Sequence, residues 1–409
     1  MPIIGHIAES HRDMTMWRRD IHAHPELGMQ ESRTNAVVQA KLRSFGVDEI
    51  ITGLARTGVV GVIHGRRKRG RAIGLRADID ALPIHEATGL PYASQHDGVM
   101  HACGHDGHTA MLLGAARYLS ETRNFDGTVY AIFQPAEEGL GGGATMVKDG
   151  LFERCPMEMV FGMHNWPQLP AGTFAWRDGP IMAGGAKIEI TITGKGSHGA
   201  FPHLGIDPIV IASHVVCALQ SIVARNIDPA ENGVVTIGQI NAGRTCNVIP
   251  ETVHMLGTAR WFNPRVGDLI EDGIRHLTAG IAESFGAKAH VVFEHICPPT
   301  VNDADATALA QRAATAVVGE TRVAPIHHPT MAGEDFAFML NAKRGSYILL
   351  GAGRGQSDPT LHQPDYDFND EILPIGASYW ATLAERLLPQ EDCGPLAQPR
   401  HALAPLPER

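Results

Sequence analysis

The sequence lacks a basic excess, a long apolar run and any closely spaced pair of cysteines. It carries 34 lysine and arginine residues against 44 aspartate and glutamate residues, for a formal net charge of −10 at pH 7. Because charge-driven binding to nucleic acid or anionic membranes needs a basic surface, we expect neither partner. No stretch reaches the roughly 18 apolar residues of a membrane span, and no apolar signal segment opens the chain. We therefore expect a soluble, cytoplasmic protein.

The six cysteines, at positions 103, 155, 217, 246, 297 and 393, form no C-x-x-C pair. In a chain of 409 residues, this scatter is typical of free thiols in a reducing compartment. Histidine, by contrast, is abundant, with 22 residues. Many histidines stand beside glycine, aspartate or glutamate at the ends of predicted elements, where a site can be built.

The length exceeds the roughly 250–300 residues at which a single core stops growing, so we expect two domains. Strand-length apolar runs such as Thr128–Phe133 alternate with helical segments such as 108–121. This alternation predicts an α/β catalytic domain with a mixed central sheet covered by helices on both faces, formed by residues 1–184 and 297–409. Residues 185–296 follow the order strand, helix, two strands, helix, strand, which predicts an inserted ferredoxin-like α+β lid domain. Residues 390–409 are rich in proline and polar groups, which predicts a loose tail.

The strongest local signal for a site is the histidine-rich segment Met100–His108. Cys103 and His105 are two positions apart, so in an extended backbone both side chains leave from one face. A thiolate and an imidazole together suit a borderline metal such as zinc. The alternative is a histidine-rich turn that caps a helix beginning at His108.

Two adjacent glutamates, Glu137 and Glu138, follow the strand at 128–133. Neighbouring side chains of an extended chain point in opposite directions, so without a kink the two carboxylates cannot both bind one ion. They can divide the work, with one binding a metal and the other reaching the water beside it. The alternative is a pair of solvated glutamates that begin a helix, where the helix dipole favours them.

Three further candidates stand at predicted strand ends or on loops, where open α/β sheets place their sites. They are His164, His362 and Asp78, the last with Asp80 close by. A single histidine in such a place is more often structural. One of the two aspartates could orient a metal-binding imidazole, or both could form a turn before Pro83.

A glycine run at residues 139–144 fits the pattern G-x-G-x-x-A of dinucleotide-binding turns. Four residues separate it from the preceding strand, however, so the required tight turn is absent. A nicotinamide-dependent zinc oxidoreductase is therefore a weak alternative, as is a metal-binding module without catalysis.

Eight segments occur in one order between about residue 12 and residue 385, and together they carry a family resemblance. The chain resembles the hippurate hydrolase, N-acyl-amino-acid amidohydrolase and auxin-conjugate hydrolase group of the aminoacylase and carboxypeptidase-G-like metallopeptidases. The segments are His22–Leu27, Leu75–Pro83, Met100–His108, Phe133–Gly139, Gly162–Asn165, Gly194–Gly199, Asn247–Pro250 and Ala332–Phe336.

The resemblance implies a site with two divalent metal ions, zinc or manganese, with cobalt or nickel also compatible. Glu137 is then the general base, Asp78 is a further catalytic candidate, and His198 in the lid polarises the scissile carbonyl from its own subunit or from a partner. Asn247 and Arg260 contact the substrate carboxylate. Arg56 and Arg76 lie near these segments without a predicted role. The implied metal ligands are Cys103, His105, Glu138, His164 and His362.

The activity implied is hydrolysis of the amide bond of an N-acyl amino acid, in particular an N-aroyl, hippurate-like one, to a carboxylic acid and a free amino acid. The partner is then a small-molecule substrate, and the assembly a homodimer or homotetramer. The alternative on the same site is a deaminase, or a hydrolase of another aromatic amine or amide.

Overall fold

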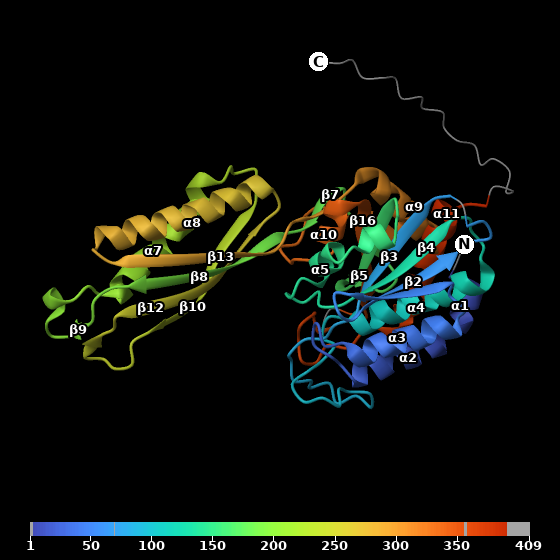
Figure 1. Ribbon diagram of the computed structural model, residues 1–409, viewed down its shortest axis with the longest axis horizontal. Helices are drawn as coiled ribbons and strands as arrows, with labels where there is room; N and C mark the ends of the chain where they lie inside the picture. The colour runs from blue at the N-terminus through green and yellow to red at the C-terminus, as the bar shows by residue number, and fades with distance from the viewer. Residues whose placement is uncertain (1–2, 69, 356–357, 391–409) are drawn as a thin grey trace, which may run out of the picture.

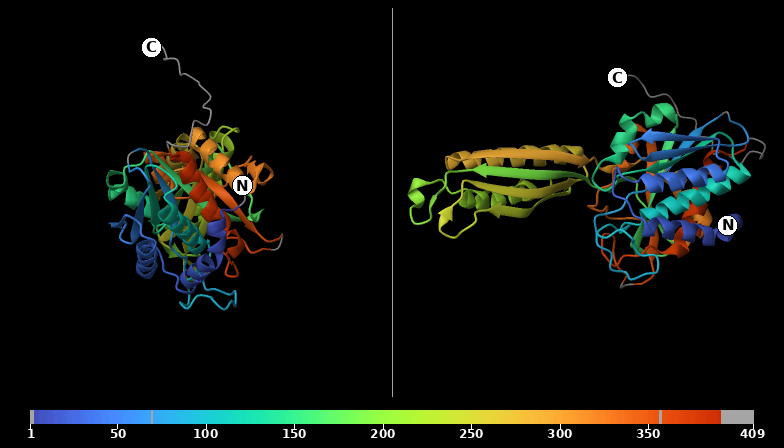
Figure 2. Two further views of the ribbon diagram at one scale, coloured as in Figure 1. Left: turned by 90° about the vertical axis from the view of Figure 1, so that its right-hand side faces the viewer. Right: turned by 60° about the horizontal axis from the view of Figure 1, so that its bottom comes forward.

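The computed structural model describes residues 3–68, 70–355 and 358–390, and it shows two units of different size (Figure 1). The larger unit contains the N-terminus and most of the helices. The smaller unit, coloured green to yellow, extends from one end of the larger one, and both further views show the same elongated arrangement (Figure 2). Of the predicted tail at 390–409, only Gln390 falls among the described residues.

The larger unit is built on an eight-stranded mixed sheet. Its strands, in spatial order, are β1 (Glu49–Leu54), β2 (Gly58–His64), β4 (Thr128–Gln134), β3 (Ala72–Asp78), β5 (Met159–Pro170), β16 (Arg344–Gly353), β6 (Phe174–Trp176) and β15 (Val323–Pro325). The four central strands β4, β3, β5 and β16 are parallel, whereas β2 and β6 pair with them antiparallel. All seven residues of β4 are buried, as expected for a strand covered on both faces.

Helices cover both faces of this sheet, and each face has its own apolar core. The helices over one face are α1 (Gly5–Glu9), α2 (His11–Ala23), α3 (Ser32–Ser44), α4 (His105–Thr122), α9 (Ala304–Val318) and α11 (Leu373–Leu387). The opposite face carries the short helices α5 (Gly142–Lys148), α6 (Leu151–Arg154) and α10 (Ala337–Ala342), and the strand pair β7 (Gly179–Met182) and β14 (Thr300–Asn302). The predicted α/β architecture is confirmed.

The smaller unit is a four-stranded antiparallel sheet with two helices on one face. Its strands, in spatial order, are β10 (Gly233–Ala242), β12 (Thr252–Trp261), β8 (Gly184–Thr193) and β13 (Lys288–Cys297). The helices α7 (Pro208–Ser221) and α8 (Pro264–Ser284) pack on each other and on the sheet, around a core separate from those of the larger unit. This order of elements is the ferredoxin-like order predicted from the sequence.

Alternation along β8 explains why only one face of the smaller sheet is covered. Ile188, Ile190 and Ile192 are buried beneath the helices, whereas Lys187 on the opposite face is exposed. The segment Pro208–Asn226, formed by α7 and the π-helical turn Ile222–Asn226, has by length and composition alone the character of a membrane-spanning helix. This differs from the expectation that no stretch reaches the length of a membrane span, and in the structure the segment packs its apolar side against the sheet.

Candidate metal centre

The five predicted ligands come from separate segments that meet at one edge of the large sheet. Cys103 lies in the turn before α4, and His105 is the first residue of that helix. Glu138 follows β4, His164 lies on β5 beyond the end of its pairing with β3, and His362 lies on the loop after β16. The carboxyl ends of parallel strands are where open α/β sheets form their sites.

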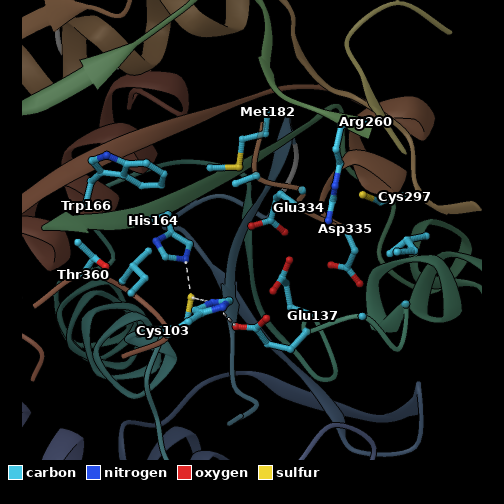
Figure 3. Close-up of a pocket in the computed structure, with 18 of the residues that line it drawn as sticks. Cys103, Glu137, His164, Trp166, Met182, Arg260, Cys297, Glu334, Asp335 and Thr360 are labelled. Atoms are coloured by element: carbon cyan, nitrogen blue, oxygen red, sulfur yellow. Dashed lines mark hydrogen bonds and ion pairs between the residues drawn. The ribbon is translucent and has the colours of Figure 1, made fainter. Parts of the chain in front are cut away.

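Cys103 stands at the centre of the cluster (Figure 3). Its Sγ lies 3.4 Å from Nε2 of His164 and 3.3 Å from Nε2 of His362, and that nitrogen of His362 lies 3.2 Å from Oε1 of Glu138. The possible ligand atoms form two sets, and within each set all atoms lie within 4.8 Å of one another. One set is Cys103, His105 and His164, and the other is Cys103, Glu138 and His362. The two sets share the thiol, so the geometry suits two neighbouring cations with a bridging sulfur.

Contacts on the far side of two imidazoles orient them toward this cluster. Nδ1 of His105 donates to the backbone oxygen of Asp80 at 3.0 Å, and Nδ1 of His164 donates to the backbone oxygen of Asn165 at 2.6 Å. Each Nε2 is therefore left as an acceptor or metal ligand. Nε2 of His105 is buried and has no hydrogen-bond partner among the described residues, which a bound cation would provide. The donor set of one thiol, three imidazoles and one carboxylate fits a borderline divalent metal.

The electrostatic environment of the cluster also favours a cation. Burial, together with Glu138 and Glu137, raises the pKa of the Cys103 thiol well above its usual range. Burial alone would lower the pKa of His105, but Asp78 and Asp80 outweigh it and raise the pKa to about 10. Neighbouring carboxylates contribute to both shifts, and a divalent ion would offset their negative charge while favouring the thiolate.

The segment that carries the two glutamates is kinked rather than extended. Ala136 has φ 55°, in the left-handed region that residues with a Cβ seldom adopt, and its amide donates to Glu31 at 2.9 Å. As a result, ligand atoms of Glu137, Glu138 and His105 all lie within 4.8 Å of one another. The opposite directions expected of neighbouring carboxylates applied to an extended backbone, and this segment is kinked instead. Glu31, which holds the kink, was not singled out from the sequence.

Glu137 is the predicted general base, and it faces a second pair of carboxylates. Its ligand atom lies within 4.8 Å of those of Glu334 and Asp335, which are buried. Burial and the neighbouring charge of Glu334 raise the pKa of the Glu137 carboxyl well above its usual range. Perturbed carboxyl groups of this kind, in a cavity beside a metal cluster, are typical of acid–base catalysts.

Asp78 lies behind the cluster, in contact with Arg76 and His108. Its Oδ2 accepts from Arg76 at 2.8 Å, and its Oδ1 accepts from Nδ1 of His108 at 2.5 Å. It lies 3.7 Å from Nε2 of His105, whereas Asp80 contacts Nδ1 of that ring directly. Of the two aspartates considered as the carboxylate that orients His105, the geometry assigns that contact to Asp80.

Arg76, which had no predicted role, is the hub of this network. Its guanidinium donates to Asp78 at 2.8 Å, to Glu334 at 2.8 Å and to Asp335 at 3.3 Å, and all four groups are buried. The available signal in the sequence was a single arginine within the apolar strand segment before Asp78. That pattern indicates a buried positive charge, but it does not predict which carboxylates pair with it.

A cavity of about 600 Å³ opens above the cluster, between the two units. The larger unit lines it with Cys103, Glu137, His164, Trp166, Met182 and Glu334, and the smaller unit with Arg260, Ile296 and Cys297. Figure 3 shows Arg260 on the side of Glu334 and Asp335, with Trp166 on the opposite side near His164. The predicted Arg260 is thus brought to the cavity.

His198 and Asn247 do not reach this cavity within the chain. His198 lies on the two-residue strand β9 (Ser197–His198), which pairs with β11 (Val248–Ile249) just after Asn247. Figure 1 places β9 at the end of the smaller unit farthest from the larger one, and both side chains are exposed. A role for either residue at the cluster therefore requires movement of the smaller unit or a second copy of the chain.

The glycine run forms no dinucleotide-binding turn. The amide of Gly143, in the first turn of α5, donates to the carboxylate of Asp335 at 2.7 Å. A Cβ at Gly142 would lie 1.7 Å from the backbone oxygen of Pro135. The glycines therefore allow close packing within the protein at this point.

Comparison with known proteins agrees with this geometry. The model of peptidase family M20/M25/M40 matches residues 74–386, more than half of the chain. The chain is similar to the hippurate hydrolase of Campylobacter jejuni, with 41% identity over 95% of this chain and 100% of the relative. It is also similar to the N-acetyl-L-cysteine deacetylase of Bacillus subtilis, with 42% identity over 92% of this chain and 88% of the relative.

Among solved structures, the YXEP protein of Bacillus subtilis, a dinuclear metal-binding peptidase from the M20 family, has a TM-score of 0.79 and 35% identity. The similarity covers 93% of this chain and 99% of that chain. The predicted family is confirmed, and with it the hydrolytic class of the activity. The chain belongs to peptidase family M20/M25/M40 and is an amidohydrolase.

Proposed function

We propose that the protein is a two-metal hydrolase of N-acyl amino acids that prefers aromatic acyl groups. The observation that carries this proposal is a single cavity lined by four of the five candidate ligands, by Glu137 and by Arg260, with the fifth ligand, His105, directly beside Cys103 and His164. The relatives include both a hippurate hydrolase and an N-acetyl-L-cysteine deacetylase, so the family alone leaves the acyl group open.

The ligand cluster would hold two divalent cations. Cys103 would contribute to both, with His105 and His164 on one side and Glu138 and His362 on the other. When bound, such ions would polarise the amide carbonyl and lower the pKa of the attacking water. Thiolate and imidazole donors favour zinc, while manganese, cobalt and nickel also suit the carboxylate and imidazoles.

Glu137 would move the proton during cleavage. It accepts a proton from the water whose oxygen bonds to the acyl carbon, and it delivers that proton to the amine nitrogen as the carbon–nitrogen bond breaks. The raised pKa of Glu137 suits both steps, because its carboxyl can then hold the proton between them. The products are a carboxylic acid and a free amino acid.

The two ends of the cavity differ in chemistry, and this difference orients the substrate. Arg260 forms no ion pair with any other described residue, so its guanidinium is available for the carboxylate of the amino acid. Trp166 and Met182 supply apolar surface away from it, against which an aromatic acyl group can pack. The amide between these two groups would then lie over Cys103 and Glu137.

The smaller unit would act as a lid or as a dimerisation unit. His198 and Asn247 are exposed at its far end, from which they could reach a cavity after closure or in a partner subunit. The described cysteines are free, which agrees with action in a reducing cytoplasm.

A substrate panel tests the proposal. N-benzoyl, N-acetyl and longer N-acyl amino acids would be assayed after chelation and after each metal is added back, with separate measurement of amino acid and ammonia. We expect the highest kcat/KM for benzoyl substrates, and a larger loss for benzoyl than for acetyl substrates in Trp166→Ala. Equal rates for both acyl groups would refute the aromatic preference. Release of ammonia without the amino acid would support the deaminase alternative instead.

A further inference from the structure

Arg260 reaches the cavity by crossing a gap in its own sheet. Arg260 on β12 pairs in register with Gly185 on β8, and Gly185 pairs with Cys297 on β13. Directly paired residues of neighbouring strands project from the same face with Cβ atoms about 4.5–5.5 Å apart. Gly185 places no side chain in this row, so the long arginine side chain can lie across the central strand toward Cys297.

The distances show that this gap is filled by the arginine itself. A Cβ added at Gly185 would lie 2.5 Å from Nη1 and 3.1 Å from Cζ of Arg260. These separations are shorter than the van der Waals contact distances of carbon and nitrogen atoms. Any larger residue at position 185 would therefore displace the guanidinium.

A second glycine, from the larger unit, also lies against the guanidinium. A Cβ at Gly333 would lie 2.9 Å from Nη1 of Arg260 and 3.1 Å from Sγ of Cys297. Gly333 directly precedes Glu334 and Asp335, which Arg76 and Gly143 hold in place through hydrogen bonds. The glycine therefore stands on a segment that is fixed to the large sheet.

The backbone does not require glycine at either position. Neither Gly185 nor Gly333 has a positive φ, so an alanine could adopt both conformations. What the structure uses at these two positions is the absence of a side chain beside Arg260.

We propose that Gly185 and Gly333 form a slot that positions the guanidinium of Arg260 to bind the substrate carboxylate. The slot has one wall from each unit, so the arginine is held in place only while the two units keep this relative position. This inference rests on the proposed role of Arg260. The two glycines are positioning residues, because they act through the arginine and not on the substrate.

A double-mutant cycle on the metal-loaded enzyme tests the slot. Gly185→Ala and Gly333→Ala would each be made alone and together with Arg260→Ala. Gly238→Ala is the matched control, since a Cβ there meets nothing within 4 Å and its φ is not positive. The substrates would be N-benzoylglycine and its carboxamide, which lacks the charged carboxylate. Thermal unfolding and metal content would show that each variant is folded and loaded.

We expect each glycine variant to raise KM for the carboxylate substrate about tenfold or more, with kcat and the carboxamide kinetics changed much less. In the Arg260→Ala background, the same glycine substitutions should raise KM for the carboxylate substrate by less than about a further twofold. Glycine effects of equal size with and without Arg260 would overturn the slot, as would KM values like those of Gly238→Ala.

The proposed role of Arg260 can be refuted independently of the slot, and in that case a crystal structure of a glycine variant tests the slot. If Arg260→Ala changes both substrates equally, Arg260 is not the carboxylate contact. A crystal structure of Gly333→Ala would still test the geometry, because the slot requires the guanidinium to move from its wild-type position. An unmoved guanidinium in that variant would refute the slot whatever the substrate.

Discussion

Replacing Arg76 with glutamine is expected to destabilise the protein strongly, because it removes a buried cation that contacts three buried carboxylates. The guanidinium is 1% exposed and pairs with Asp78 and Glu334 at 2.8 Å and with Asp335 at 3.3 Å. Glutamine keeps a hydrogen-bonding amide but carries no charge. Removing one partner of a buried ion pair costs about 3–5 kcal/mol, since the remaining charge stays out of water without compensation.

An exposed arginine with equally short contacts provides the control. Arg344 pairs with Asp303 at 3.0 Å and with Asp305 at 2.9 Å, but its side chain is 52% exposed. Exposed ion pairs are screened by water and contribute little to stability, so Arg344→Gln should change the free energy of unfolding little. The comparison isolates burial, because the donor–acceptor distances in the two networks are similar.

Thermal unfolding of chelator-treated protein would measure both effects. At about 2–4 °C per kcal/mol, Arg76→Gln should lower Tm by roughly 6–20 °C, and Arg344→Gln should change Tm much less. The loss in Arg76→Gln should shrink as pH falls, because the native carboxyls can then take up protons in place of the missing cation. Similar Tm shifts in the two variants, or a loss that grows toward low pH, would refute the reasoning.

Three further predictions concern the base, a ligand and a buried histidine. Glu137→Gln should keep its metal but lose roughly 10²–10⁴-fold in kcat, and near-normal turnover would reject Glu137 as the base. Glu138→Ala should lose metal, so two full equivalents by elemental analysis would reject it as a ligand. Burial lowers the pKa of His22, but hydrogen bonds to Asp106 and Glu86 outweigh it and raise the pKa to about 9. The stability contributed by protonated His22 is complete below the pKa of an unfolded-chain histidine, about 6.5, and is lost as pH rises through 9. The Tm difference between wild type and His22→Gln should therefore be larger at pH 6 than at pH 10.

The sequence by itself determined the order of the elements and the chemical types at the site. Period-two alternation in 187–193 and unbroken apolar runs such as Thr128–Phe133 reflect which faces are buried, and burial pattern is local information. Strand ends could be located in the same way, so His164 and Glu138 could be expected at the carboxyl ends of strands in one sheet. The ordered motif series predicted which of these residues bind metal.

Only the tertiary structure decided which of these residues meet. Cys103 contacts His164 and His362, which are 61 and 259 residues away, through a strand order in which β3 lies between β4 and β5. The kink at Ala136 and the partners of Arg76 depend on the same packing.

The placement of the smaller unit is likewise not encoded in any local pattern. Arg260 lies at the cavity while His198 and Asn247 lie far from it, although all three belong to that unit. Side-chain periodicity specifies which face of an element is buried, but contacts between distant segments follow from how whole elements pack.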